Sequence, residues 1–185
     1  NKSLGDIKRM QISITQAYFM QLLIKINKVK KILEVGTFTG YSALSMALAI
    51  DDGFITCLDK NEKTSKVAIN FFNKAKIKKK INLIVGDAID SLKDLLSKNK
   101  KFDLIFIDAD KENYKKYYDL CFKLISNNGL ILIDNVLWKG DVIDKNKNDR
   151  MTNIIRDFNT YIKNDERIEK TILPIGDGVT ICRKK

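Results

Sequence analysis

Short apolar runs alternate along the chain with longer stretches in which apolar residues recur at helical spacing. This alternation is typical of a sheet of parallel strands joined by helices. The first five predicted strands span residues 31–35, 54–59, 81–85, 103–107 and 130–133. The predicted helices span residues 16–26, 41–50, 63–76, 88–97, 112–125 and 151–163. Because the strands are nearly continuous in Ile, Leu and Val, we expect helices on both faces of the sheet.

The end of the chain departs from this alternation. Two further predicted strands, 168–173 and 179–183, are separated only by the turn Pro174-Ile175-Gly176-Asp177-Gly178. So short a connection requires the two strands to run antiparallel. We therefore predict an α/β fold whose open, mostly parallel, Rossmann-like sheet finishes in an antiparallel hairpin. The 185 residues fit a single domain, 1–185.

Composition narrows the setting of the protein. No segment approaches the ~20 apolar residues that span a bilayer, and residues 1–10 lack the apolar core of a signal peptide. Cys57, Cys121 and Cys182 are odd in number and far apart, which favours reduced thiols over a disulfide framework or a zinc site. We expect a cytoplasmic protein with no membrane partner.

The formal net charge of +11 raises the possibility of a nucleic-acid partner. Most basic residues are Lys, clustered where predicted helices end and strands begin, whereas Arg, the better bidentate ligand of phosphate, is scarce. This distribution favours solvated surface charge over an RNA-binding face. We expect no nucleic acid as a partner.

The chain contains no histidine. This excludes Ser-His-Asp and Cys-His hydrolases, as well as metal sites that need imidazole. A metal site would have to consist of oxygen ligands, which favours Mg²⁺, Ca²⁺ or Mn²⁺ over zinc.

A glycine-containing turn follows the first predicted strand. Gly36 and Gly40 allow the backbone to turn sharply and to approach a ligand at the start of the next helix. The turn is not a dinucleotide-binding fingerprint, because Phe38 occupies the place of the middle glycine. It is not a P-loop either, because Tyr41 and Ser42 follow Gly40. The pattern favours a ligand that carries adenosine without phosphates.

Carboxylates end the next two predicted strands. Asp59 lies about twenty residues beyond the glycine turn, where it can accept hydrogen bonds from a ribose diol. Asp87 follows the third strand, where it can accept the amino group of an adenine. The alternative for both residues is N-capping of the following helix. Ribose binding is favoured for Asp59, whereas both interpretations remain open for Asp87.

Three further oxygen-bearing side chains end the fourth and fifth predicted strands. Asp108 follows the fourth strand, and Asp134 and Asn135 follow the fifth. Adjacent parallel strands open into one crevice, so these side chains can converge on a hard cation such as Mg²⁺. Helix capping is the alternative for any one of them. The three together favour a metal site.

Three segments of the sequence resemble one family. Residues 34–42, 106–114 and 133–138 are similar to motifs of the caffeoyl-CoA O-methyltransferases and their catechol O-methyltransferase relatives. The resemblance runs from about Met10 to the end of the chain. It implies a class I methyltransferase fold and a metal-dependent enzyme that uses S-adenosylmethionine.

The resemblance also implies roles for individual residues. S-adenosylmethionine would lie over Gly36, with its ribose on Asp59 and its adenine near Asp87 and Ala88. The remaining residues that match cofactor contacts of the family are Met10, Glu34, Thr37, Ser42 and Asp108. Members of the family usually carry another helical segment before the position of Met10, so we expect that segment to be shortened here. A homodimer is expected by resemblance alone.

The metal suits methyl transfer to a catechol. Both oxygens of a vicinal aromatic diol can chelate the cation, which lowers the pKa of the hydroxyl. By resemblance, Lys111 is the general base, Asp108 shares in catalysis, and the phenolate attacks the methyl group in line. Trp138 is a candidate for the wall of the substrate site and Lys111 a candidate for substrate contact.

Other residues near these motifs are interpreted more plainly. Asp110 and Glu112 suit a helix start, and Asp177 is interpreted as a hairpin-turn residue. Tyr114, Tyr117 and Tyr118 are interpreted as packing residues. For the polar segment 140–148, contact with substrate and a plain surface connection remain equal alternatives.

Two other functions compete with O-methylation. Enzymes that methylate exocyclic base nitrogens carry an Asn/Asp-Pro-Pro-aromatic motif after the fourth strand, where this chain has Asp108-Ala109-Asp110-Lys111. A non-catalytic basic binding module gives no reason for Asp108, Asp134 and Asn135 to share a crevice. The sequence therefore favours a small aromatic diol or its CoA ester as acceptor.

Overall fold

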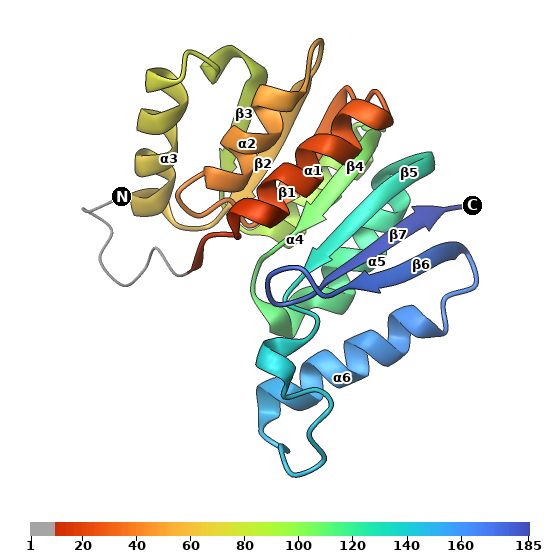
Figure 1. Ribbon diagram of the computed structural model, residues 1–185. Helices are drawn as coiled ribbons and strands as arrows, with labels where there is room; N and C mark the ends of the chain where they lie inside the picture. The colour runs from red at the N-terminus through yellow and green to blue at the C-terminus, as the bar shows by residue number, and fades with distance from the viewer. Residues whose placement is uncertain (1–9) are drawn as a thin grey trace.

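Seven strands form one sheet in the order β3-β2-β1-β4-β5-β7-β6 in the computed structural model, which describes residues 10–185 (Figure 1). The strands are β1 Lys31–Val35, β2 Phe54–Asp59, β3 Ile81–Val85, β4 Phe102–Ile107, β5 Ile125–Asp134, β6 Ile168–Leu173 and β7 Val179–Lys184. All neighbouring pairs from β3 to β5 are parallel, and β7 runs antiparallel to both β5 and β6. The predicted parallel sheet with an antiparallel hairpin is confirmed.

Residues 10–185 contain six α-helices, of which α1 precedes β1 and the other five connect successive strands. They are α1 Ile14–Ile26, α2 Tyr41–Ala49, α3 Glu62–Lys74, α4 Ala88–Ser97, α5 Tyr114–Leu124 and α6 Arg150–Lys163. Short 3₁₀ turns occur at η2 Lys78–Lys80, η3 Lys111–Asn113 and η4 Trp138–Gly140. Side-chain oxygens of Ser13, Asn61, Asp87 and Asp149 accept hydrogen bonds from first-turn N–H groups of α1, α3, α4 and α6. These caps fix where the four helices begin.

Each face of the sheet carries its own apolar core. In β4, Leu104 and Phe106 face the core formed with α1, α2 and α3, while Ile105 and Ile107 face the other core. That second core is formed with α4, α5 and α6. Successive strand residues point to opposite faces, so strands covered on both sides must be apolar throughout. The prediction of helices on both faces is confirmed.

The boundary between α5 and β5 differs from the prediction. The helix expected over 112–125 begins as the 3₁₀ turn η3 and ends at Leu124, and β5 starts at Ile125 instead of residue 130. The Asn127-Asn128-Gly129 segment has turn-forming residues, and Asn128 has a φ of +62°. It forms a bulge inside β5: Ile125 pairs with Phe102 and Leu130 pairs with Leu104, and the register with β4 shifts between these two pairs.

The carboxyl ends of β1, β2, β4 and β5 lie at one edge of the sheet, where the loops that follow them gather (Figure 1). Such an edge is the usual ligand site of an open α/β sheet. Within residues 10–185, no helix has the length and apolar character needed to cross a bilayer. Cys57, Cys121 and Cys182 are buried free thiols.

Candidate functional site

The turn between β1 and α2, residues 36–40, brings backbone unusually close to the end of β4. Gly36 has a φ of +93°, and a Cβ atom there would lie 2.0 Å from the carbonyl oxygen of Asp108. Only glycine fits such a contact. At the other end of the turn, Gly40 caps α2 without any side-chain hydrogen bond to the helix. The first N–H groups of α2 are therefore not capped by a protein side chain, as in helices that receive a ligand at this end.

The carboxylate of Asp59 shapes this glycine turn. Its Oδ2 accepts hydrogen bonds from the N–H groups of Thr37 at 3.0 Å and Phe38 at 2.6 Å. Its Oδ1 accepts the N–H of Asn61 at 2.8 Å. The alternative interpretation of Asp59 as a helix cap is wrong, because Asn61 caps α3. A carboxylate oxygen accepts two hydrogen bonds, so Oδ1 retains capacity for a further donor.

Asp87 caps α4, as one of its two interpretations predicts. Its Oδ1 accepts the N–H groups of Ile89 at 2.8 Å and Asp90 at 3.1 Å. The carboxylate is otherwise exposed at the end of β3, and Ala88 is the first residue of the helix. Capping occupies one oxygen only, so the second remains available for another donor.

Glu34 is a fully buried carboxyl group next to the glycine turn. The hydroxyl of Ser42 donates to its Oε1, while Oε2 has no hydrogen-bond partner among residues 10–185. Burial raises the pKa of Glu34 to about 7, and the hydrogen bond from Ser42 opposes that rise. An unpartnered buried carboxylate oxygen is costly. Its position fits a site that receives a hydrogen-bond donor from a ligand.

Asp108 and Asp134 stand at neighbouring strand ends. Ile107, the last residue of β4, pairs with Ile133 of β5; Asp108 follows Ile107, and Asp134 is the last residue of β5. Burial raises the pKa of Asp134 to about 6, and the negative charge of Asp108 adds to the rise. Asn135 follows in the left-handed conformation, with a φ of +57°. The structure thus places the three residues at two neighbouring strand ends.

Lys111 connects Asp108 with a buried tyrosine. Its Nζ donates to Oδ1 of Asp108 at 3.0 Å and to the hydroxyl of Tyr114 at 2.5 Å. The Tyr114 hydroxyl in turn donates to the backbone carbonyl of Asp134 at 3.0 Å. One amine is therefore held between two strand ends. Tyr114 packs in the core as predicted, but its hydroxyl also belongs to this network.

Sequence reasoning did not assign that role to Tyr114. A signal was present, because Tyr114 follows Lys111 by three residues, the spacing at which helical side chains meet. The contact of Gln16 with the β6–β7 turn was also not predicted. Gln16 is a buried residue of α1 whose amide oxygen lies close to Gly176 in the β6–β7 turn. A contact between such distant parts of the chain leaves no local signal.

The turn between β6 and β7 fixes the segment that follows Asn135. The carbonyl of Asp177 accepts the N–H of Leu137 at 3.0 Å, and its carboxylate accepts the N–H of Lys139 at 2.5 Å. Asp177 is a turn residue, as predicted, and it also anchors η4. Trp138 is half-buried, and its side chain packs against the second core. Its exposed remainder lies close in sequence to Asn135.

Met10 is the first residue that the structure describes, and its side chain is largely exposed. The amide of the adjacent Gln11 donates to the hydroxyl of Thr39 at 2.7 Å. This bond brings the start of the described chain next to the glycine turn. The Met10 side chain itself projects into solvent.

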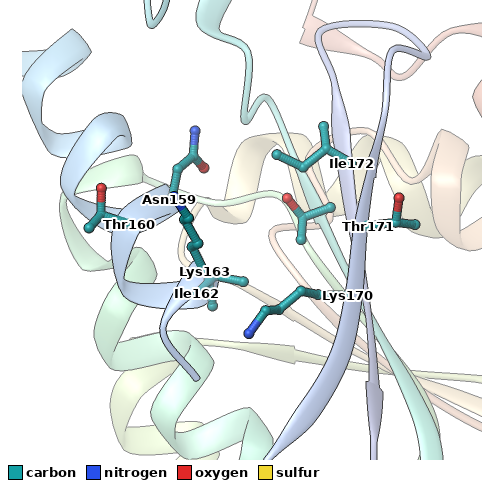
Figure 2. Close-up of a pocket in the computed structure, with 8 residues that line it drawn as sticks. Asn159, Thr160, Ile162, Lys163, Lys170, Thr171 and Ile172 are labelled. Carbon is teal, nitrogen blue, oxygen red and sulfur yellow. The ribbon is translucent and has the colours of Figure 1, made fainter. Parts of the chain in front are cut away.

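Two cavities flank α6. One, of about 320 Å³, lies between α6 and β6, with Lys163 from the helix and Lys170 from the strand in its wall (Figure 2). The other, of about 390 Å³, lies between α5 and α6 and is lined in part by Lys111 and Tyr114. Gly36 and Asp134 line neither of these two cavities, whereas Lys111 of the candidate site lines the second.

The candidate metal ligands include only two acidic residues. Within residues 10–185, no group of three or more His, Cys, Asp and Glu residues lies close enough to hold a metal ion. The predicted set contains Asp108, Asp134 and the amide of Asn135. Such a set supplies three hard oxygen atoms and leaves positions for water or substrate.

The sequence matches the O-methyltransferase family over residues 2–185. It is 37% identical to a caffeoyl-CoA O-methyltransferase of Populus kitakamiensis over 193 residues, which cover 99% of this chain and 82% of that protein. It is also 37% identical to a flavonoid 3′,5′-methyltransferase of Vitis vinifera, covering 95% of this chain and 79% of that protein.

The fold is similar to solved structures. An O-methyltransferase from Bacillus cereus in complex with SAH superimposes with a TM-score of 0.87 and 34% sequence identity. The match covers 95% of this chain and 83% of the other.

Proposed function

The chain belongs to the O-methyltransferase family, and we propose that it moves the methyl group of S-adenosylmethionine to one hydroxyl of a vicinal aromatic diol with the help of a divalent cation. One observation carries the proposal. Lys111, Asp108 and Asp134 form a single network at two neighbouring strand ends, directly beside Gly36. A base, two hard ligands and a backbone platform for a cofactor therefore share one crevice.

The glycine turn and its neighbours would hold S-adenosylmethionine. The unpartnered Oε2 of Glu34 fits an ammonium donor, and the free capacity of Asp59 Oδ1 fits a ribose hydroxyl. Asp87 and Ala88 would border the adenine. Thr37, Ser42, Asp108 and the segment at Met10 complete the proposed contacts. When bound, the cofactor supplies an electrophilic methyl group on a sulfonium.

Asp108, Asp134 and Asn135 would hold the cation. Two carboxylates crowd together at the strand ends, and part of the rise in the Asp134 pKa comes from the charge of Asp108. A cation between them would relieve that repulsion. All three ligands are oxygen atoms, so Mg²⁺ fits first, with Ca²⁺ or Mn²⁺ as alternatives. When bound, the metal supplies charge that lowers the pKa of a coordinated hydroxyl.

Lys111 would act as the general base. In its neutral form, Nζ would accept the proton of the reacting hydroxyl, and the oxygen freed of that proton would receive the methyl group that the bound cofactor supplies, with the thioether of the demethylated cofactor as the leaving group. Asp108 and Tyr114 hold the amine in place, since each lies within hydrogen-bond distance of Nζ. A fixed base and a fixed acceptor lower the barrier mainly by positioning the reacting atoms.

The acceptor class follows from the relatives and from the surface beside the metal ligands. The relatives are described as acting on caffeoyl-CoA and on flavonoids. Trp138 follows Asn135 by three residues and offers an aromatic wall. We therefore propose a small molecule with two adjacent ring hydroxyls, free or as a CoA ester.

The test is a methyl-transfer assay with matched acceptors. Caffeoyl-CoA, free caffeate and a flavonoid with adjacent hydroxyls should each be compared with an analogue in which one hydroxyl is absent. Transfer to the diols and little to the analogues is expected. Equal transfer to both sets would exclude chelation of a diol as the basis of recognition.

A further inference from the structure

Arg156, on the second turn of α6, binds the loop 141–148 with all parts of its guanidinium group. Nε donates to the carbonyl of Val142 at 3.0 Å. Nη2 donates to the carbonyls of Asp141 at 3.0 Å and Asp144 at 2.6 Å, and Nη1 donates to that of Lys147 at 2.6 Å. One side chain thus ties together four carbonyls of a single loop.

Arg156 forms no ion pair within residues 10–185. Among residues 10–185, its remaining contacts are the side-chain oxygens of Asn148 and Asn153, and no carboxylate pairs with it. A guanidinium group that donates only to carbonyl and amide oxygens stabilises one conformation of the loop backbone, because each of its N–H groups needs an acceptor in a fixed position. Without it, the carbonyls of Val142 and Lys147 would lose this donor, and those of Asp141 and Asp144 would keep only the N–H groups of Asp144 and Lys147.

The backbone just before this loop is in a strained conformation. Trp138, Lys139 and Gly140 have φ angles of +48°, +57° and +87°. Left-handed conformations at a tryptophan and a lysine are costly and persist only where the surroundings enforce them. Here Asp177 holds η4 on one side, and Arg156 holds the loop on the other.

Two apolar side chains depend on this arrangement. Trp138 and Val142 pack against the second core from η4 and from the loop. Ile143, which follows Val142, is instead 82% exposed. The segment therefore presents apolar groups at the edge of the sheet on backbone that is held by hydrogen bonds. The segment follows directly after the carboxyl end of β5, where Asp134 is the last residue of the strand and Asn135 comes next (Figure 1).

We infer that Arg156 is a positioning residue for the methyl acceptor: it holds the loop 141–148 so that the wall beginning at Trp138 has its working shape before the acceptor binds. This role rests on the proposed function, because it assigns the wall to the acceptor. Arg156 touches neither the cofactor residues nor the network of Lys111. Its effect should therefore fall on acceptor binding and leave cofactor binding unchanged.

The experiment compares Arg156→Ala and Arg156→Lys with the wild-type chain. Amide hydrogen exchange is measured at Asp141, Ile143, Asp144 and Lys147, whose N–H groups are bonded within the segment. The KM for caffeoyl-CoA and the Kd for S-adenosylmethionine are measured in parallel. We expect faster exchange in the alanine variant, a KM for caffeoyl-CoA raised about tenfold, and an unchanged cofactor Kd.

The lysine variant tests the forked geometry, since an ammonium cannot reproduce it, and should lie between the other two proteins. Arg183→Ala is the matched control, because it removes a surface arginine that bonds Glu169 and Asn128 far from the loop. Unchanged exchange or an unchanged KM in Arg156→Ala would overturn the inference alone. A wild-type chain that methylates no diol would overturn the proposed function, and this role with it.

Discussion

Lys111 Nζ lies 3.0 Å from Oδ1 of Asp108, and the two side chains are only 11% and 21% exposed. An ion pair this sheltered is not a surface pair of little consequence. In the proposed mechanism Asp108 also holds the cation, so the base and the metal ligand are physically joined. A change at Lys111, which is not among the proposed cofactor contacts, should therefore affect the chemical step more than cofactor binding.

Replacement of the base tests this directly. Lys111→Ala should lower kcat by about 100-fold or more, because a positioned general base contributes at least that much. The Kd for S-adenosylmethionine should stay within about twofold of the wild-type value, since Lys111 is not among the proposed cofactor contacts. Lys116→Ala, an exposed lysine on α5, is the control and should retain wild-type kcat. Wild-type turnover in Lys111→Ala would remove this residue as the base.

The hydroxyl of Tyr114 should matter beyond packing. Tyr114→Phe keeps the ring in the core but removes the bond to Lys111 and the bond to the Asp134 carbonyl. We expect kcat to fall about tenfold, with about 1 kcal/mol lost from the free energy of unfolding. Tyr161→Phe loses one hydroxyl bond to Asp119 and serves as the control. If both variants lose only stability, Tyr114 has no part in positioning the amine.

Glu34 should make the fold less stable as the pH rises. Its pKa in the folded chain is about 7, against 4.5 for the unfolded chain, so between these values the native state binds more protons. Stability is then greatest below pH 4.5 and declines up to about pH 7. Urea unfolding of the wild type and Glu34→Gln isolates this contribution, since glutamine does not titrate.

The expected difference between those two proteins is large enough to measure. Between pH 5 and pH 8 the wild type should lose about 2 kcal/mol more than Glu34→Gln, from the linkage of one buried carboxyl. The same scan with saturating S-adenosylmethionine should show a smaller loss, because a bound ammonium group would favour the ionised form. Parallel pH profiles for the two proteins without ligand would show that Glu34 is not buried in its neutral form.

Much of the fold follows from the sequence because its strands are simple. Each of β1 to β4 is an apolar run that a turn or a carboxylate ends, so both the strand and the polar residue at its tip could be located. The start of β5 could not, since Asn127-Asn128-Gly129 has the composition of a turn and forms a bulge, and only the pairing of Ile125 with Phe102 extends the strand to residues before it. Local pattern does not contain that pairing.

The candidate site divides in the same way. Asp108 and Asp134 could be brought together from sequence because their strands are adjacent in a parallel sheet. Asp87 stayed ambiguous because capping and ligand binding require the same side chain at the same place, and the structure shows only the cap. The contacts of Arg156 depend on how α6 returns over its own preceding loop. No local sequence pattern predicts that contact.

Metal dependence is the most direct test of the account. Methyl transfer to caffeoyl-CoA should be measured on protein freed of metal by EDTA and again after Mg²⁺ is added in excess, with Asp134→Asn alongside. The account predicts that EDTA lowers transfer by at least about 100-fold, that Mg²⁺ restores it, and that Asp134→Asn responds poorly to added metal. Full transfer in excess EDTA would contradict it.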